Sequence, residues 1–140
     1  MCLTKAGYET GYVGKWHLDG DAKPGFAPKR QFGFDDNRYM INRGHWKLLK
    51  KSGNTAALIG EWSKGKYKYE IEDADATSFT TDFLCDRTLE IIKRDKTKPF
   101  CVMLSIPDPH GPNSVRKPYD TMFADMQFER PRTMLVEDST

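Results

Sequence analysis

Residues 7–18 of the chain read Gly-Tyr-Glu-Thr-Gly-Tyr-Val-Gly-Lys-Trp-His-Leu, and the interpretation of the whole sequence begins here. The β-branched and aromatic residues from Thr10 to Val13 predict a short strand. Gly14 removes a side chain at a point suited to the close approach of another backbone or a ligand. If the extended conformation continues past Gly14, Lys15 and His17 project from the same face, because side chains alternate along a strand. An ammonium beside an imidazole suits an anionic substrate that gains or loses a proton during reaction.

The same stretch resembles the second signature of the sulfatase family, a Gly-Tyr-x-Thr-x-x-x-Gly-Lys-Trp-His run that follows the catalytic nucleophile. Every defining position is filled, from Gly7 to His17. An isolated Lys-x-His is more often a solvated lysine and a capping histidine, whereas the full pattern at this spacing favours the family. The resemblance implies an arylsulfatase-like hydrolase of the alkaline-phosphatase-like superfamily. Its fold class is α/β, and this chain is expected to form an incomplete part of a mostly parallel sheet with helical cover.

The resemblance also implies a chemistry, the hydrolysis of a sulfate ester. In the family a formylglycine hydrate attacks sulfur, and a divalent cation, expected to be calcium, neutralises the sulfate oxygens. By resemblance, Lys15 stabilises the hydrate and binds the sulfate, while His17 takes the proton when sulfate is expelled. The expected substrate is a sulfated small molecule or a sulfated glycan.

Composition describes a globular chain without a strong charge bias. At 140 residues it has the size of one ordinary domain, whereas catalytic domains of sulfatases are considerably longer. Hydrophobic residues make up 38% and charged residues 30%, and no apolar run approaches the ~20 residues of a membrane span. The 22 basic and 20 acidic residues leave a net charge of +2, which is too small to indicate a nucleic-acid partner.

The cysteines and serines do not supply the family's nucleophile. Cys2, Cys85 and Cys101 are widely spaced, form no Cys-x-x-Cys pair and are interpreted as small buried hydrophobic residues. Formylglycine is made from the Cys or Ser of a Cys/Ser-x-Pro/Ala-x-Arg motif, and no cysteine of this chain begins one. Ser105 has the proline but is followed by Pro109 where the motif requires arginine. The nucleophile is therefore expected outside this chain.

The ends of the sequence indicate that residues 1–140 are a single partial domain, an internal segment of a sulfatase catalytic domain. Lys5-Ala6-Gly7 is typical of the last turn of a helix and its C-cap, with neither a signal peptide nor a full helix before it. Asp35-Asp36-Asn37 is a poor metal cluster, because consecutive residues of a strand point to opposite faces. In the family the metal ligands lie before and after the segment that this chain resembles, so the resemblance implies that the cation's ligands belong to the remainder of the parent domain. Sulfatases are usually exported, but this chain does not reveal its compartment.

After the signature, Gln31-Phe32-Gly33-Phe34-Asp35 resembles the family's Gly-Phe-Asp element. Aromatic and basic residues follow at Tyr39, Arg43, His45 and Trp46, in a region that helps to build the substrate pocket of the family. The alternative for this region is an amphipathic helix or an irregular loop with solvated basic residues.

Two regular elements are expected before the next strand. Lys66–Ile71 alternates polar and apolar residues and predicts an edge strand of a solvated hairpin. Ser78–Lys96 is predicted to be the main helix, capped by Thr77 or Ser78. Its apolar stripe comprises Phe79, Phe83, Leu84, Thr88, Ile91 and Ile92.

Pro99–Ile106 is an apolar run that predicts a strand buried on both faces. The proline-rich loop that follows contains His110, at the carboxyl end of the strand where functional loops of α/β sheets lie. This loop is similar to the family's Pro-His-x-Pro segment, whose histidine contacts the sulfate group and the leaving oxygen. We therefore expect Lys15, His17 and His110 to converge as catalytic residues, with Lys15 and His110 binding the substrate.

Alternative functions remain open. One is a phosphohydrolase of the same superfold, which shares the metal chemistry but lacks a Gly-Lys-Trp-His element of this form. Another is a noncatalytic binding or structural remnant that kept the strands and lost the chemistry. Because the chain lacks a nucleophile and metal ligands, it is expected to be inactive when expressed alone.

Overall fold

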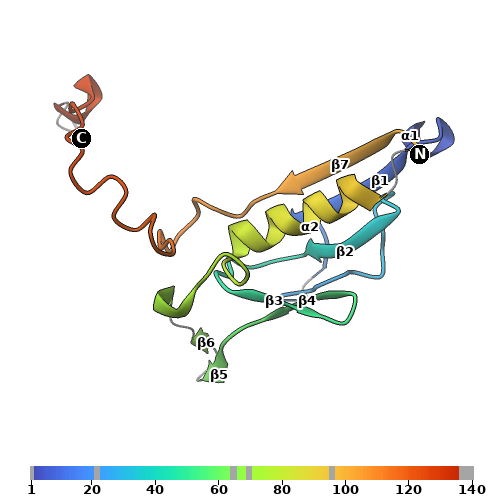
Figure 1. Cartoon of the computed structure of the whole chain (residues 1–140), viewed down its shortest axis with the longest axis horizontal. Coiled ribbons are helices and arrows are strands. Elements are labelled where there is room, and N and C mark those ends of the chain that lie inside the picture. The colour runs from blue at the N-terminus through green and yellow to red at the C-terminus, as the bar shows by residue number, and fades with distance from the viewer. Residues whose placement is uncertain (1, 21–22, 64–65, 69–70, 95–96, 136–140) are drawn as a thin grey trace.

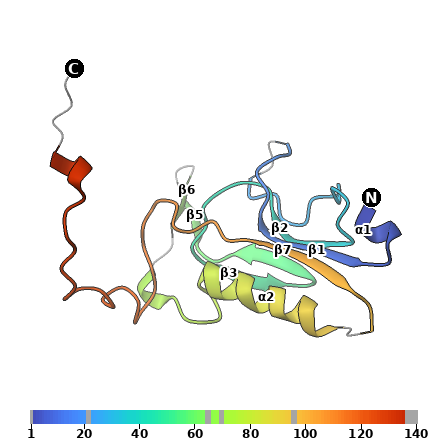
Figure 2. The same ribbon diagram turned by 90° about the horizontal axis from the view of Figure 1, so that it is seen from above.

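The computed structural model describes residues 2–20, 23–63, 66–68, 71–94 and 97–135. At its centre, strand β1 (Glu9–Lys15) lies between β2 (Asp36–Ile41) and β7 (Phe100–Ser105), and both strand pairs are parallel. Helix α2 (Thr80–Arg94) covers one face of this sheet, and the loop between β1 and β2 lies on the opposite side (Figure 1 and Figure 2). The predicted α/β class, with a parallel sheet and helical cover, is confirmed.

Antiparallel hairpins and short helices flank the sheet. The hairpins are β3 (Leu49–Ser52) with β4 (Thr55–Leu58), and β5 (Glu61–Ser63) with β6 (Lys66–Lys68). The short helices are α1 (Cys2–Lys5) and the 3-10 segments Ile71–Asp73 and Arg132–Leu135. The predicted hairpin strand is confirmed from Lys66 to Lys68; Tyr69 and Glu70 lie outside the described residues, and Ile71 begins a 3-10 segment instead.

Two predictions about glycines are confirmed, the C-cap at Gly7 before β1 and the close approach at Gly14 near its end. Gly7 has φ +83 and ends α1 in a Schellman motif, in which Tyr8 N donates to Leu3 O at 3.1 Å and Gly7 N donates to Thr4 O at 3.1 Å. Gly14 has φ +99, and a Cβ atom there would collide with the backbone carbonyl of Ser105 in β7. The expected close approach at Gly14 is therefore an approach of backbone.

The extended conformation does not continue to His17. β1 ends at Lys15, and His17 adopts φ +61, in the left-handed region that costs a non-glycine residue roughly 1–2 kcal/mol. Its backbone N–H nevertheless donates to Asn42 O at 2.9 Å, just beyond the end of β2. The same-face prediction for Lys15 and His17 assumed an extended chain to His17, and this condition fails, because β1 ends at Lys15 and His17 lies in the left-handed region.

The core lies between β1, β2, β3 and α2. Its buried members are Val13, Tyr39, Ile41, Leu49, Ala56, Phe83 and Leu84. Tyr39 is 1% exposed, so it belongs to the core and lines no substrate pocket. Residues 42–47, which carry Arg43, His45 and Trp46, form an irregular loop between β2 and β3, as the loop alternative expected, but Arg43 and His45 are half-buried in it.

The main helix is two residues shorter at its start than predicted. α2 begins at Thr80, and the hydroxyls of Thr77 and Ser78 donate to Asp75 Oδ1 at 2.8 Å and 2.7 Å, so neither residue caps it. The Thr80 N–H donates instead to Lys47 O at 2.9 Å. The apolar stripe is confirmed: Phe79, Phe83, Leu84 and Thr88 are buried, and Ile91 and Ile92 are half-buried. The predicted end at Lys96 lies outside the described residues.

β7 is not buried on both faces as predicted. Met103 is 53% exposed and Leu104 36% exposed, because in the described chain β7 pairs only with β1 and α2 covers only one face. The segment after β7 leaves the body of the molecule with its apolar side chains exposed, among them Met122, Phe123, Met126 and Phe128 (Figure 1).

The cysteines are all free, and they are less buried than expected. Cys2 is exposed, while Cys85 and Cys101 are half-buried. Burial, with smaller contributions from Asp82 and Asp86, raises the pKa of the Cys85 thiol. A raised pKa leaves this thiol protonated near neutral pH, which is consistent with a packing role.

Candidate active site

The carboxyl ends of the parallel strands bring basic side chains together. Lys15 is the last residue of β1, His45 follows β2, and His110 follows β7. Parallel strands end at a common edge, and α/β proteins place their functional residues at this edge. Lys15 and His45 are half-buried, whereas His17 and His110 are exposed.

His45 joins the other basic residues. The Lys15 ammonium lies 3.0 Å from His45 Nε2 and 3.3 Å from Nδ1. The His45 ring also stacks on the His110 ring, with centroids 3.3 Å apart and an interplanar angle of 13°. Lys15 and His110, both predicted from the sequence, are thus brought to one place through a residue between them. We call Lys15, His17, His45 and His110 the basic cluster.

Electrostatics in the basic cluster favour neutral imidazole at His45. Burial lowers the pKa of His45, and the charges of Lys15, His110, His17 and Lys23 lower it further. The pKa of Lys15 is also lowered, by burial and by the nearby charge of Lys23. An ammonium can only donate hydrogen bonds, so His45 must offer Lys15 an unprotonated nitrogen. His17 follows Lys15 at the same edge of the sheet, two residues beyond the end of β1.

Comparison with known proteins identifies the family to which this chain belongs. A sulfatase family model matches residues 2–134, nearly the whole chain. The chain belongs to the sulfatase family. An N-acetylglucosamine-6-O-sulfatase from Bacteroides thetaiotaomicron is 30% identical over 111 residues, which cover 77% of this chain and 16% of the relative. An ulvan-active sulfatase from Formosa agariphila is 32% identical over 120 residues, which cover 84% of this chain and 21% of the relative.

A third relative extends the match along the chain. An uncharacterised sulfatase, YidJ, from Escherichia coli is 27% identical over 136 residues, covering 89% of this chain and 25% of the relative. No solved structure gives a significant match. The sulfatase chain described here therefore spans a quarter or less of the length of these relatives.

The sulfatase signature and the Gly-Phe-Asp element pack directly on each other. Thr10 donates to Asp35 Oδ2 from its backbone nitrogen at 2.9 Å and from its hydroxyl at 2.8 Å. The Trp16 ring lies 4.9 Å from Phe32 and 6.1 Å from Phe34, measured between centroids. Through these contacts the Gly-Phe-Asp element supports the strand that carries Lys15.

Further contacts fix the backbone at Lys15 itself. The Tyr12 hydroxyl donates to Lys15 O at 2.7 Å, and the Tyr12 ring packs edge-on against Trp16 at 5.0 Å. Tyr12 is 4% exposed, so this hydrogen bond is sheltered from water. The aromatic residues of the signature are thus structural supports for its lysine.

His45 is the site residue that sequence reasoning did not single out. The sequence places it in the pocket-building region with Arg43 and Trp46, but without a motif that separates these three residues. The structure separates them, because Trp46 donates from Nε1 to Arg43 O at 3.0 Å and packs against the core, whereas His45 contacts Lys15. The isolated Gly-His pair at residues 44–45 carried no spacing signal.

The described residues do not fit a metal site. No group of three or more His, Cys, Asp or Glu side chains is arranged to hold an ion among them. Asp36 is already bound, accepting from Arg38 Nε and Nη2 at 3.0 Å and from Arg94 Nη1 at 2.8 Å. Burial raises the pKa of Asp36, but hydrogen bonds from Arg38 and Arg94 outweigh burial and leave the pKa lowered. None of the described helices is long and apolar enough to span a membrane.

Proposed function

We propose that this chain is part of a sulfatase in which the basic cluster binds the sulfate group of a sulfate ester. The observation that supports this proposal is the contact of His45 with both Lys15 and His110 at the carboxyl edge of the sheet. Basic groups held this closely disfavour each other's charged forms. A bound sulfate ester offsets that repulsion and accepts hydrogen bonds from the ammonium and imidazole groups.

Each proposed catalytic residue has a separate role. Lys15 donates from Nζ to the sulfate oxygens and stabilises the charge that develops there. His110 binds sulfate and protonates the alcohol oxygen as its bond to sulfur breaks. His17 accepts a proton when sulfate is expelled from the enzyme. These roles need exposed imidazoles beside a half-buried ammonium, which is the exposure that these residues have.

A sulfated glycan is the substrate class that the relatives support, with a sulfated small molecule as the simpler case. One relative is named as an N-acetylglucosamine-6-O-sulfatase. The nucleophile and the ligands of the family's divalent cation, expected to be calcium, lie in this proposal in the remainder of the parent catalytic domain. The steps assigned to Lys15, His17 and His110 do not depend on the geometry of that nucleophile or of those metal ligands.

Turnover of a chromogenic aryl sulfate by the full-length protein tests the proposal. Lys15→Ala and His17→Ala are each expected to lower turnover by ~10²–10⁴-fold, because a positioned proton acceptor or charge contributes that much. Lys50→Ala, which removes an exposed lysine of β3, serves as the control and should retain full turnover.

Two outcomes contradict the proposal. Wild-type turnover in the Lys15 or the His17 variant removes that residue from the mechanism. Faster hydrolysis of the matching aryl phosphate than of the aryl sulfate supports the phosphohydrolase alternative instead.

A further inference from the structure

The segment before β3 is tied to the start of α2. Trp46 O accepts from Thr80 Oγ1 at 2.7 Å, and Lys47 O accepts from the Thr80 backbone at 2.9 Å. Leu49 N donates to Ser78 O at 2.8 Å. Because Thr80 is fully buried, these hydrogen bonds are sheltered from water and fix the backbone position of Lys47.

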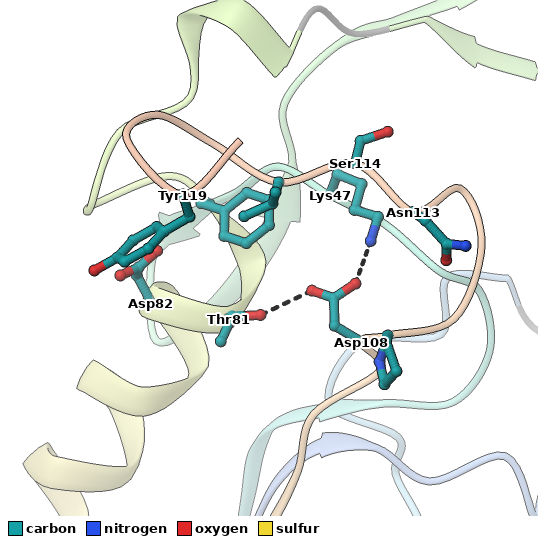
Figure 3. A pocket seen from close by; sticks show the side chains of 10 residues that line it. Lys47, Thr81, Asp82, Asp108, Asn113, Ser114 and Tyr119 are labelled. Atoms are coloured by element: carbon teal, nitrogen blue, oxygen red, sulfur yellow. Dashed lines mark hydrogen bonds and ion pairs between the residues drawn. The ribbon is translucent and has the colours of Figure 1, made fainter. Parts of the chain in front are cut away.

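An ion pair between Lys47 and Asp108 joins this segment to the loop after β7. The Lys47 side chain is 3% exposed, and its ammonium donates to Asp108 Oδ1, while Thr81 Oγ1 donates to Asp108 Oδ2 at 2.8 Å (Figure 3). A lysine this buried is tolerated only when its charge is paired. Both carboxylate oxygens of Asp108 are therefore held, at the wall of a cavity of about 680 Å³.

Asp108 belongs to the same turn as His110. The His110 backbone N–H donates to Pro107 O at 3.2 Å, so residues 107–110 form one compact unit. His45 stacks on His110, and His45 and Lys47 also share one short segment. The same two segments are thus joined by two side-chain pairs, His45 with His110 and Lys47 with Asp108.

We infer that Lys47, Asp108 and Thr81 form a clamp that positions His110 against His45 in the sulfate pocket. They are positioning residues, because they act on the pocket through the two segments that carry His45 and His110. This inference rests on the proposed function of the basic cluster. The inference assigns to the Lys47–Asp108 pair the role of orienting His110. Stability alone gives little reason for such a pair, because replacing a buried ion pair by apolar residues is often neutral for stability.

A double-mutant comparison in the full-length enzyme separates orientation from general damage. Asp108→Asn is made in the wild type and in a His110→Ala background, and kcat for the aryl sulfate is measured in both. If the clamp acts through His110, Asp108→Asn lowers kcat by about 10-fold or more in the wild type, the scale expected for a misplaced catalytic group. In the His110→Ala background the same change lowers kcat by less than about 2-fold, because the clamped group is already gone.

Controls keep the comparison decisive. Asp86→Asn, on the exposed side of α2, is the matched substitution and should leave kcat unchanged. If Asp108→Asn does not fold, Thr81→Val replaces it, since this variant keeps the ion pair and loses one hydrogen bond. An equal loss of kcat in both backgrounds, or no loss in either, overturns the clamp.

A measurement without substrate separates this inference from the proposed function. In full-length protein with carbon-13-labelled histidine, the resonance that disappears in His110→Ala identifies His110. Stacking on His45 displaces this resonance by the ring current, and Asp108→Asn is expected to abolish the displacement while Asp86→Asn keeps it. An unchanged His110 resonance in Asp108→Asn overturns the clamp whether or not the protein hydrolyses sulfate esters.

Discussion

His45 accepts a hydrogen bond from Lys15 and stacks on His110, so its protonation state affects both neighbours. As a neutral ring it holds the ammonium through a nitrogen lone pair. As an imidazolium it can no longer accept from Lys15 and repels the charges around it. A single side chain thus links the residues that the sulfatase motifs supply from two distant parts of the chain.

We expect His45→Ala to lower turnover of the aryl sulfate by about 10- to 100-fold, because Lys15 and His110 both lose the group that orients them. His45→Gln should recover part of this loss, since its amide oxygen can accept from the Lys15 ammonium. Steady-state kinetics on the full-length protein measure both variants. Equal losses in the two variants contradict a hydrogen-bonding role for His45.

The lowered pKa of His45 also predicts a dependence of stability on pH. Folding holds this pKa below 6.5, so between the two values the unfolded chain binds a proton that the folded chain does not. Stability therefore rises with pH across this window and falls as the pH falls through it. The charges that face His45, from Lys15, His17, His110 and Lys23, act in the same direction.

Thermal melts of the full-length protein from about pH 5 to pH 7 test this dependence. The melting temperature of the wild type is expected to decrease as the pH falls from 6.5, and the decrease should be smaller in His45→Gln, which has no proton to bind. Parallel curves for the two proteins are the result that excludes His45 as a source of the pH dependence.

Strands β1 and β7 approach each other closely at Gly14, where the backbone carbonyl of Ser105 occupies the space that a side chain needs. This approach brings the end of β1, with Lys15, beside the start of the loop that carries His110. At the scale of secondary structure, the spacing between these strands is therefore part of the site.

Gly14→Ala is expected to destabilise the full-length protein by about 2–4 kcal/mol, from the steric clash with β7 together with the strain of a positive φ. Gly7→Ala is the matched control, because Gly7 also has a positive φ but nothing lies within 4 Å of its added Cβ. Denaturant unfolding of both variants isolates the clash as the difference between them. Equal destabilisation contradicts the close approach.

At the scale of the whole molecule, the sheet is uncovered at β7. β7 exposes Met103, and the segment beyond it exposes Ile106, Phe123 and Phe128. Apolar surface of this kind is typical of an interface that another part of a protein covers. The curated relatives extend well beyond the part that this chain matches, which supports the proposal that the remainder of a catalytic domain covers it.

The 140-residue chain expressed alone is expected to release no sulfate from an aryl sulfate, even with calcium supplied, and to be at best marginally folded. It has no formylglycine motif with which to attack sulfur. The unpaired edge and exposed apolar face of β7 should also promote aggregation. Sulfate release and a thermal melt followed by circular dichroism measure both claims. Metal-dependent turnover contradicts the first, and a sharp cooperative melt of a soluble monomer contradicts the second.

Local patterns in the sequence were enough to predict the strand at Thr10–Val13, the helix that became α2 and the close approach at Gly14. Each depends on residue types a few positions apart, on helical or strand periodicity, or on the missing side chain of one glycine. The family motifs identified Lys15 and His110 as candidate site residues. Both lie at the ends of strands that the local patterns predict. Strand ends of a parallel sheet meet at one edge, so their proximity follows from the topology.

The contacts that join these residues were decided only by the tertiary structure. Lys15 and His45 are 30 positions apart, and Lys47 and Asp108 are 61 positions apart, so no local spacing connects either pair. The turn at His17 likewise depends on hydrogen bonds to the segment after β2. Side chains distant in sequence meet only once the sheet has set the positions of its strand ends, and for this reason the sequence alone predicted the edge of the sheet but not the partners found there.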